Sequence, residues 1–140
     1  MSDPLRSYKE TQIKTATPGR LVVMLYDGAL KYLELGMEAL AARHRSYDRV
    51  SEYLVRAQDI ITELMVSLDF EQGREIARSL FSLYMWMNRQ ILEGNISKSS
   101  EPLEPVKKLL AELRGAWLKV ADKPGLHSAP REAGGVNIAG

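Results

Sequence analysis

His44 and His127 are the only histidines of the chain, which makes them its first candidates for catalysis or metal binding. No Glu-x-x-His pair accompanies them to form a carboxylate-bridged metal site, and no glycine-rich GxxxxGK loop is present to hold a phosphate. A histidine phosphotransfer bundle would need an exposed histidine well inside a helix, whereas His44 adjoins a break at Arg45-Ser46 and His127 lies in a Pro/Gly-containing C-terminal stretch. The sequence therefore argues against an enzyme and predicts no catalytic residue, cofactor or metal site.

The most apolar stretch of the chain, residues 17–40, predicts a central helix. Thr17 can cap the first N–H groups, and Pro18 suits the first turn because its φ is fixed and its missing N–H is not needed there. Gly28 and Gly36 each lower the helix propensity by about 1 kcal/mol, which favours close approach of a neighbouring backbone. The only polar gap is roughly 60° wide on a helical wheel, and it is formed by Asp27, Lys31, Glu34 and Glu38.

Three further helices follow from apolar residues repeated at intervals of three and four. A polar break over 44–48, with Ser46 or Asp48 as N-cap, precedes a helix that ends at about Leu68. A turn over 69–73 leads into a third helix that ends at Gly94-Asn95, and a loop over 97–102 precedes a fourth helix over about 103–121. The core positions expected on the third helix are Ile76, Leu80, Leu83, Tyr84, Met87 and Ile91.

The third helix has more apolar surface than a single core requires. Its apolar arc covers roughly 200°, about twice the minimum for a helix lying on one core, because the core stripe is extended by Phe81, Met85 and Leu92. Trp86 is expected on the opposite, polar side. A weaker second line on the preceding helix consists of Val55, Thr62 and Val66.

These elements predict one all-α domain, an antiparallel four-helix bundle over residues 17–121. Residues 1–16 are polar with isolated apolar points such as Tyr8 and Ile13, so they form either a frayed terminus or a short helix docked on the bundle. Residues 122–140 contain several prolines and glycines and few large apolar side chains, and we expect them to be disordered.

Composition excludes several classes of function. The formal charge is +1 with both signs interspersed, so no basic surface calls for nucleic acid or anionic lipid. Cysteine is absent, which suits a reducing compartment. No apolar run approaches the roughly 20 residues needed to span a bilayer, and the N-terminus lacks the apolar core of a secretory signal. A cytoplasmic protein without stable membrane insertion is expected.

Two uses of the surplus apolar surface remain open from the residues alone. An interaction protein could bind an apolar segment of another chain there, and flexible Met85 would suit such a groove. A self-associating bundle, forming a weak homodimer through Phe81, Met85 and Leu92, would explain the surface equally well. Asp27 is either a binding residue or the partner of Lys31 one helical turn away.

A series of short motifs runs in order from Ser7 to Val120. They are Ser7-Tyr8, Gln12-Ile13, Thr15-Ala16-Thr17-Pro18, Met24-Leu25-Tyr26-Asp27-Gly28-Ala29, Arg56-Ala57-Gln58, Ser67-Leu68-Asp69, Gly73-Arg74-Glu75-Ile76-Ala77, Leu83-Tyr84 and Glu112-Leu113-Arg114-Gly115-Ala116-Trp117. In order and spacing these motifs resemble the FliS family of flagellar export chaperones.

The resemblance implies a four-helix bundle that binds the disordered C-terminal segment of flagellin, prevents its premature polymerisation and delivers it to the flagellar export gate. It also implies that the segment before residue 17 lies over the client groove, either as a lid or as a client contact. The candidate client-binding residues are Tyr8, Ile13, Leu21, Tyr26, Asp27, Val55, Gln58, Val66, Phe81 and Met85.

Overall fold

The computed structural model describes residues 18–123 and His127, and within them it contains four α-helices. These are α2 (Pro18–Ala41), α3 (Tyr47–Val66), α4 (Phe70–Ser97) and α5 (Leu103–Val120). The expected all-α class is confirmed. Thr17, the predicted cap of the first helix, lies outside the described residues, and so do Tyr8 and Ile13.

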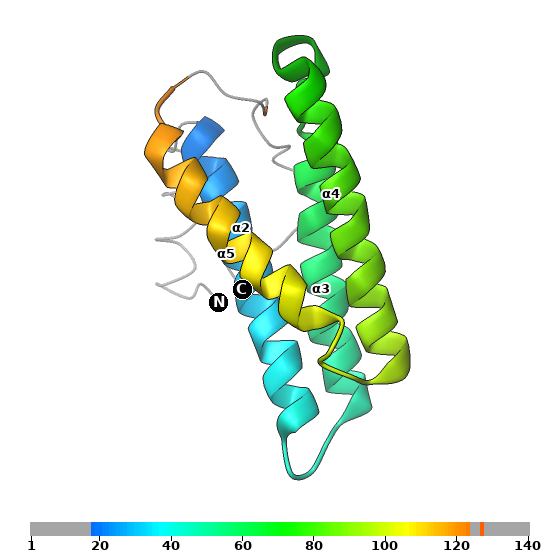
Figure 1. Cartoon of the computed structure of the whole chain (residues 1–140). Coiled ribbons are helices and arrows are strands. Elements are labelled where there is room, and N and C mark those ends of the chain that lie inside the picture. The colour runs from blue at the N-terminus through cyan, green and yellow to red at the C-terminus, as the bar shows by residue number, and fades with distance from the viewer. Residues whose placement is uncertain (1–17, 124–126, 128–140) are drawn as a thin grey trace, which may run out of the picture.

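Successive helices run in opposite directions, as an antiparallel bundle requires (Figure 1). α2 packs against α3 on one side and α5 on the other, whereas α4 packs chiefly on α3 and only lightly on α5. The start of α2 and the end of α5 meet, and Arg20 pairs there with Asp122 at 3.3 Å. The contact between α2 and α3 is therefore the most extensive in the bundle, and it joins an α2–α5 pair to an α3–α4 pair.

Local capping explains where α3 and α4 begin. The Ser46 hydroxyl accepts the backbone N–H of Arg49, so Ser46 is the N-cap of α3 and Asp48 lies in its first turn. The carboxylate of Asp69 accepts two N–H groups, which starts α4 at Phe70. The turn predicted over 69–73 is therefore a helical turn, because an Asp at this position satisfies donors that would otherwise have no partner.

Two residues with positive φ mark irregularities of α4. Arg74 (φ 45°, ψ −116°) separates the first turn, Phe70 to Gly73, from the rest of the helix. At the other end the helix continues beyond Gly94-Asn95 to Ser97, and Lys98 (φ 52°) terminates it. The prediction that Gly94 ends the helix is wrong, because Gly94 provides room for Leu103 instead: a Cβ at Gly94 would lie 2.7 Å from that side chain.

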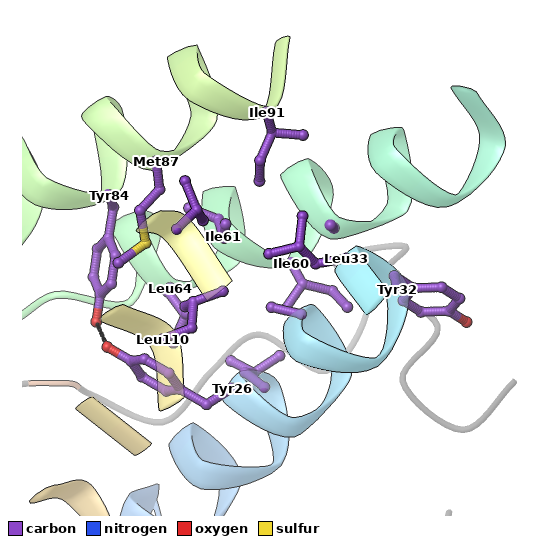
Figure 2. Packing of buried hydrophobic residues seen from close by; sticks show 14 of the residues in the cluster. Tyr26, Tyr32, Leu33, Ile60, Ile61, Leu64, Tyr84, Met87, Ile91 and Leu110 are labelled. Carbon is purple, nitrogen blue, oxygen red and sulfur yellow. Dashed lines mark hydrogen bonds between the residues drawn. The ribbon is translucent and has the colours of Figure 1, made fainter. Parts of the chain in front are cut away.

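The core lies between the four helices and is shown in Figure 2. Gly36 allows α3 to approach α2 closely, since a Cβ there would lie 2.6 Å from Leu54. The close neighbour is thus a side chain and not the backbone expected from the sequence. The largest completely buried side chains are Tyr26, Leu33, Leu54, Ile60, Ile61, Leu64, Tyr84, Met87, Ile91, Leu103 and Leu110.

Two expectations for α4 are wrong. Ile76 is 58% exposed, because the buried stripe of α4 passes through its neighbour Ala77, which lies about 100° away around the helix axis. Trp86 is partly buried against the core instead of lying on the polar side. Its indole ring is large enough to pack against the core from a position outside the buried stripe. Leu83 is also only partly buried.

None of the described helices is long and apolar enough to cross a membrane.

Candidate functional site

A line of polar contacts sets the register between α3 and α4. The amide of Gln58 donates to the carbonyl oxygen of Asn88 at 3.1 Å, and the amide of Asn88 donates to the Thr62 hydroxyl at 3.1 Å. Further along, the Ser51 hydroxyl donates to Asn95 at 2.9 Å. These residues are seven and four positions apart on α3 and seven apart on α4, which is one or two helical turns, so they follow one seam between two antiparallel helices.

Exposed apolar side chains flank this polar seam on both helices. Val55, Val66, Met85 and Leu92 are each between 43% and 51% exposed. Val55 precedes Gln58 by three positions and Met85 precedes Asn88 by three, which places these side chains beside the seam. We name this surface the α3–α4 face and define it as Val55, Val66, Phe70, Phe81, Met85 and Leu92.

The two ends of the α3–α4 face differ. At one end the Phe70 and Phe81 rings meet edge to face, with centroids 6.0 Å apart, and Phe81 is partly buried against the core. At the other end Lys98 donates to Ser51 and lies 5.7 Å from the centroid of the Tyr47 ring. The face therefore offers an aromatic end, a mainly aliphatic middle and a basic end.

Five of the candidate residues from the sequence lie on this surface or in its seam. Val55, Val66, Phe81 and Met85 belong to the face, and Gln58 lies in the seam with its amide already hydrogen-bonded. The structure brings these five together from two helices. Phe70 was not among the candidates, because the sequence placed it in a turn; its distance from Phe81 along the chain hid their contact.

The candidates on α2 lie elsewhere. Leu21 is half-buried, and Tyr26 is completely buried, so Tyr26 offers no surface to a partner in this conformation. Asp27 pairs with Arg114 of α5. Of the two alternatives for Asp27, the ion pair with Lys31 is therefore wrong, because a guanidinium of α5 is its partner instead. These three residues do not join the α3–α4 face.

A buried polar cluster between the two helix pairs was missed entirely. The Tyr26 and Tyr84 hydroxyls lie 2.6 Å apart (Figure 2), and the Tyr84 hydroxyl lies 3.3 Å from Nε2 of His127. The His127 ring also meets Trp117 edge to face at 4.9 Å. Burial raises the pKa of Tyr26 to about 12 and raises that of Tyr84 as well, whereas burial lowers the pKa of His127 to about 4.

The C-terminal segment 122–140, which was expected to be disordered, lies outside the described residues except for residues 122–123 and His127. His127 is buried and forms an isolated antiparallel β-bridge with Leu68, so the expectation does not hold at this one residue. The apolar periodicity that defines the bundle ends before this point, so it could not reveal a single polar ring that fills a space between helices. Within the described residues, no group of three or more His, Asp or Glu side chains could hold a metal ion.

Comparison with known proteins agrees with the fold and the motifs. The family model of flagellar protein FliS matches residues 1–124. The flagellar secretion chaperone FliS of Bacillus subtilis is 32% identical over 117 residues, which cover 84% of this chain and 85% of the relative. The chaperone of the same name from Salmonella typhimurium is 33% identical over 115 residues, covering 81% and 84%. The chaperone FliSB of Pseudomonas aeruginosa is 34% identical over 109 residues, covering 77% and 84%. The chain belongs to the FliS family of flagellar proteins.

Proposed function

We propose that this protein is a cytoplasmic export chaperone that binds the C-terminal segment of flagellin, prevents its premature polymerisation and delivers it to the flagellar export apparatus. Its relatives are named flagellar secretion chaperones, which supports a binding function and not an enzymatic one. The observation that carries the proposal is the α3–α4 face, an apolar surface left exposed on a bundle that already has a complete core.

The client would bind by burying apolar surface on the α3–α4 face. An apolar, amphipathic segment that is disordered in the free monomer gains about 25 cal/mol for each Å² buried, less the entropy lost when it becomes ordered. Val55, Val66 and Leu92 offer aliphatic contacts, and Met85 adapts its shape because its side chain is unbranched. The polar seam beneath them is already hydrogen-bonded, so a client need not satisfy it.

The sequence candidates outside the face enter this proposal differently. Tyr8 and Ile13 belong to the segment that we propose covers the client groove before binding. Leu21 and Asp27 lie on α2, where Asp27 pairs with Arg114 of α5, and they contact a client only if it extends past the face. Delivery to the export gate requires a second surface, which we propose is separate from the α3–α4 face because the client occupies that face.

One substitution with a matched control tests the proposal. Met85→Glu places a carboxylate on the face, and a bound client would desolvate it without a partner. Ile76→Glu makes the same change at an exposed position of the same helix, about 180° around the helix axis from Met85. Affinity is measured by titration with a peptide of the flagellin C-terminal segment, and folding by circular dichroism.

We expect Met85→Glu to fold normally and to bind the peptide at least about tenfold more weakly, a loss of about 1.4 kcal/mol or more. Ile76→Glu should bind within about twofold of the wild type. Equal affinities for the two variants would refute the assignment of the face. If Met85→Glu abolished self-association in sedimentation while peptide binding survived, the face would be a homodimer interface instead.

A further inference from the structure

Lys98 places an ammonium group at the basic end of the α3–α4 face. Its Nζ donates to the Ser51 hydroxyl of α3 at 2.9 Å and to the side-chain oxygen of Asn95 of α4. Ser51 lies one helical turn before Val55, and Asn95 lies one helical turn after Leu92. Because Val55 and Leu92 both belong to the face, the ammonium group is bonded to the two helices at the point where the face ends.

The hydrogen bonds among these three residues use their acceptors and leave donors over. The Asn95 oxygen accepts from the Ser51 hydroxyl and from Lys98, and the Ser51 oxygen accepts from Lys98. An ammonium group has three N–H donors and a carboxamide group has two. One donor of Lys98 and both amide donors of Asn95 therefore have no hydrogen-bond partner among the described residues.

The positive charge of Lys98 has no negative counterpart in the described part of the chain. Lys98 forms no salt bridge there, and its third close neighbour is the ring of Tyr47, whose centroid lies 5.7 Å from Nζ. Lysine is also unusual at this position, because φ is 52°, a left-handed conformation that glycine and asparagine adopt more easily. Neutral groups therefore hold a half-buried cation whose remaining donors suit an anion.

We propose that Ser51, Asn95 and Lys98 form a carboxylate subsite, which binds the terminal carboxylate of the client and thereby sets the direction of the client along the α3–α4 face. An ionised carboxylate only accepts hydrogen bonds, so it matches the remaining donors, and its charge complements that of Lys98. The terminal carboxylate is the one anionic group that a C-terminal segment carries whatever its sequence. The residues before it extend along the face toward its aromatic end. This inference rests on the proposed function for the identity of the client.

The experiment titrates the full-length chain with two forms of the flagellin C-terminal peptide, one with a free terminal carboxylate and one with a terminal amide. Low salt is used, because salt screens the attraction between exposed charges. Lys98→Gln and Lys98→Asn both remove the charge, and asparagine also suits the left-handed backbone. Lys108→Gln is the matched control, since it removes one charge from an exposed lysine of α5. Circular dichroism checks the folding of each variant, and the comparison of the two peptides on the wild type needs no variant.

The wild type and Lys108→Gln should bind the free carboxylate form about fivefold or more tightly than the amide form, as expected for one ion pair at a partly exposed site. Both Lys98 variants should bind the two forms alike, with the affinity of the wild type for the amide. Equal affinity of the wild type for the two forms refutes the subsite alone. A preference for the free carboxylate that persists in the Lys98 variants refutes the role of Lys98. If neither form binds the wild type, the proposed function fails and the subsite fails with it.

Discussion

The hydroxyl group of Tyr26 on α2 lies 2.6 Å from that of Tyr84 on α4, and both side chains are completely buried. α2 and α4 are diagonal members of the bundle, since each packs mainly against α3. The hydrogen bond between the two phenol groups therefore spans the core and fixes the position of the apolar face of α2 relative to that of α4. The Tyr84 hydroxyl also reaches His127, so three polar groups from distant parts of the chain meet in one place.

The two tyrosines should differ in their contribution to stability. Tyr26→Phe removes one hydroxyl and leaves Tyr84 bonded to His127, which should cost about 1 kcal/mol of unfolding free energy. Tyr84→Phe leaves both the Tyr26 hydroxyl and Nε2 of His127 without this partner, so it should cost more, up to about 3 kcal/mol. Urea unfolding measures both values. A larger loss for Tyr26→Phe would show that Tyr84 is not the centre of the cluster.

Stability should depend on pH through His127. Its pKa falls from 6.5 in the unfolded chain to about 4 in the fold because burial disfavours the charged ring. The unfolded state therefore binds the proton first, and the contribution of His127, complete above pH 6.5, is lost as the pH falls toward 4 at up to about 1.4 kcal/mol per pH unit. The rings in contact with it, Tyr84 and Trp117, carry no charge in this range.

The check is the difference in unfolding free energy between the wild type and His127→Phe, measured from pH 4 to pH 7. The difference isolates His127 because all other titrating groups are common to both proteins. The unfolding free energy of the wild type, relative to that of His127→Phe, should decrease as the pH falls. A difference that does not change with pH would mean that the ring is solvated.

Arg74 should be a site where glycine stabilises the protein. Its φ of 45° with ψ of −116° lies in a region that only glycine adopts without strain, and such strain costs about 1–3 kcal/mol. Arg74→Gly should raise the unfolding free energy by about 1 kcal/mol, since the gain is partly offset by the greater freedom of the unfolded chain.

Arg74→Ala is the control, because alanine keeps the Cβ that causes the strain and removes only the long side chain. Thermal unfolding compares the three proteins. A stabilisation by alanine equal to that by glycine would assign the effect to the arginine side chain and not to the backbone.

Substitution by alanine should change the unfolding free energy in opposite directions at two glycines. At Gly36 a Cβ would lie 2.6 Å from Leu54, so Gly36→Ala should push α3 away from α2 and cost about 1–3 kcal/mol. At Gly115 of α5, no heavy atom lies within 4 Å of the added Cβ apart from the adjacent residues and the nearby backbone of the same helix, so Gly115→Ala should gain about 1 kcal/mol of helix propensity. Chemical denaturation measures the change in unfolding free energy for each variant. Destabilisation by Gly115→Ala would mean that another element packs against α5 at this position.

The sequence predicted what depends on local periodicity and capping. Apolar repeats located the four helices of the described part of the chain, and Ser46 was correctly one of two candidates for the N-cap of α3. Asp69 was treated as part of a turn, because whether a capping residue begins a helix there depends on the residues that follow. Near the start of α4 the buried residue is Ala77 and not Ile76, and the apolar periodicity alone did not distinguish these two neighbours.

Contacts between residues far apart in the chain could not be predicted from the sequence. The pairing of Asp27 with Arg114 depends on how α5 lies across α2, and the docking of His127 depends on a space left where α4 and α5 diverge. The α3–α4 face was predicted in part, because surplus apolar residues beyond a core stripe are visible on a helical wheel. Its polar seam and its aromatic end emerged only from the packing of the two helices.

Site-specific photo-crosslinking tests the central claim most directly. Benzoylphenylalanine is placed at Val55 of α3, at Leu92 of α4 and, as a control, at exposed Ile76, and each protein is irradiated with the flagellin C-terminal peptide. The α3–α4 face predicts covalent adducts from positions 55 and 92 and none from position 76. Adducts from position 76 alone, with none from positions 55 and 92 at a saturating peptide concentration, would contradict the assignment of the client site to this face.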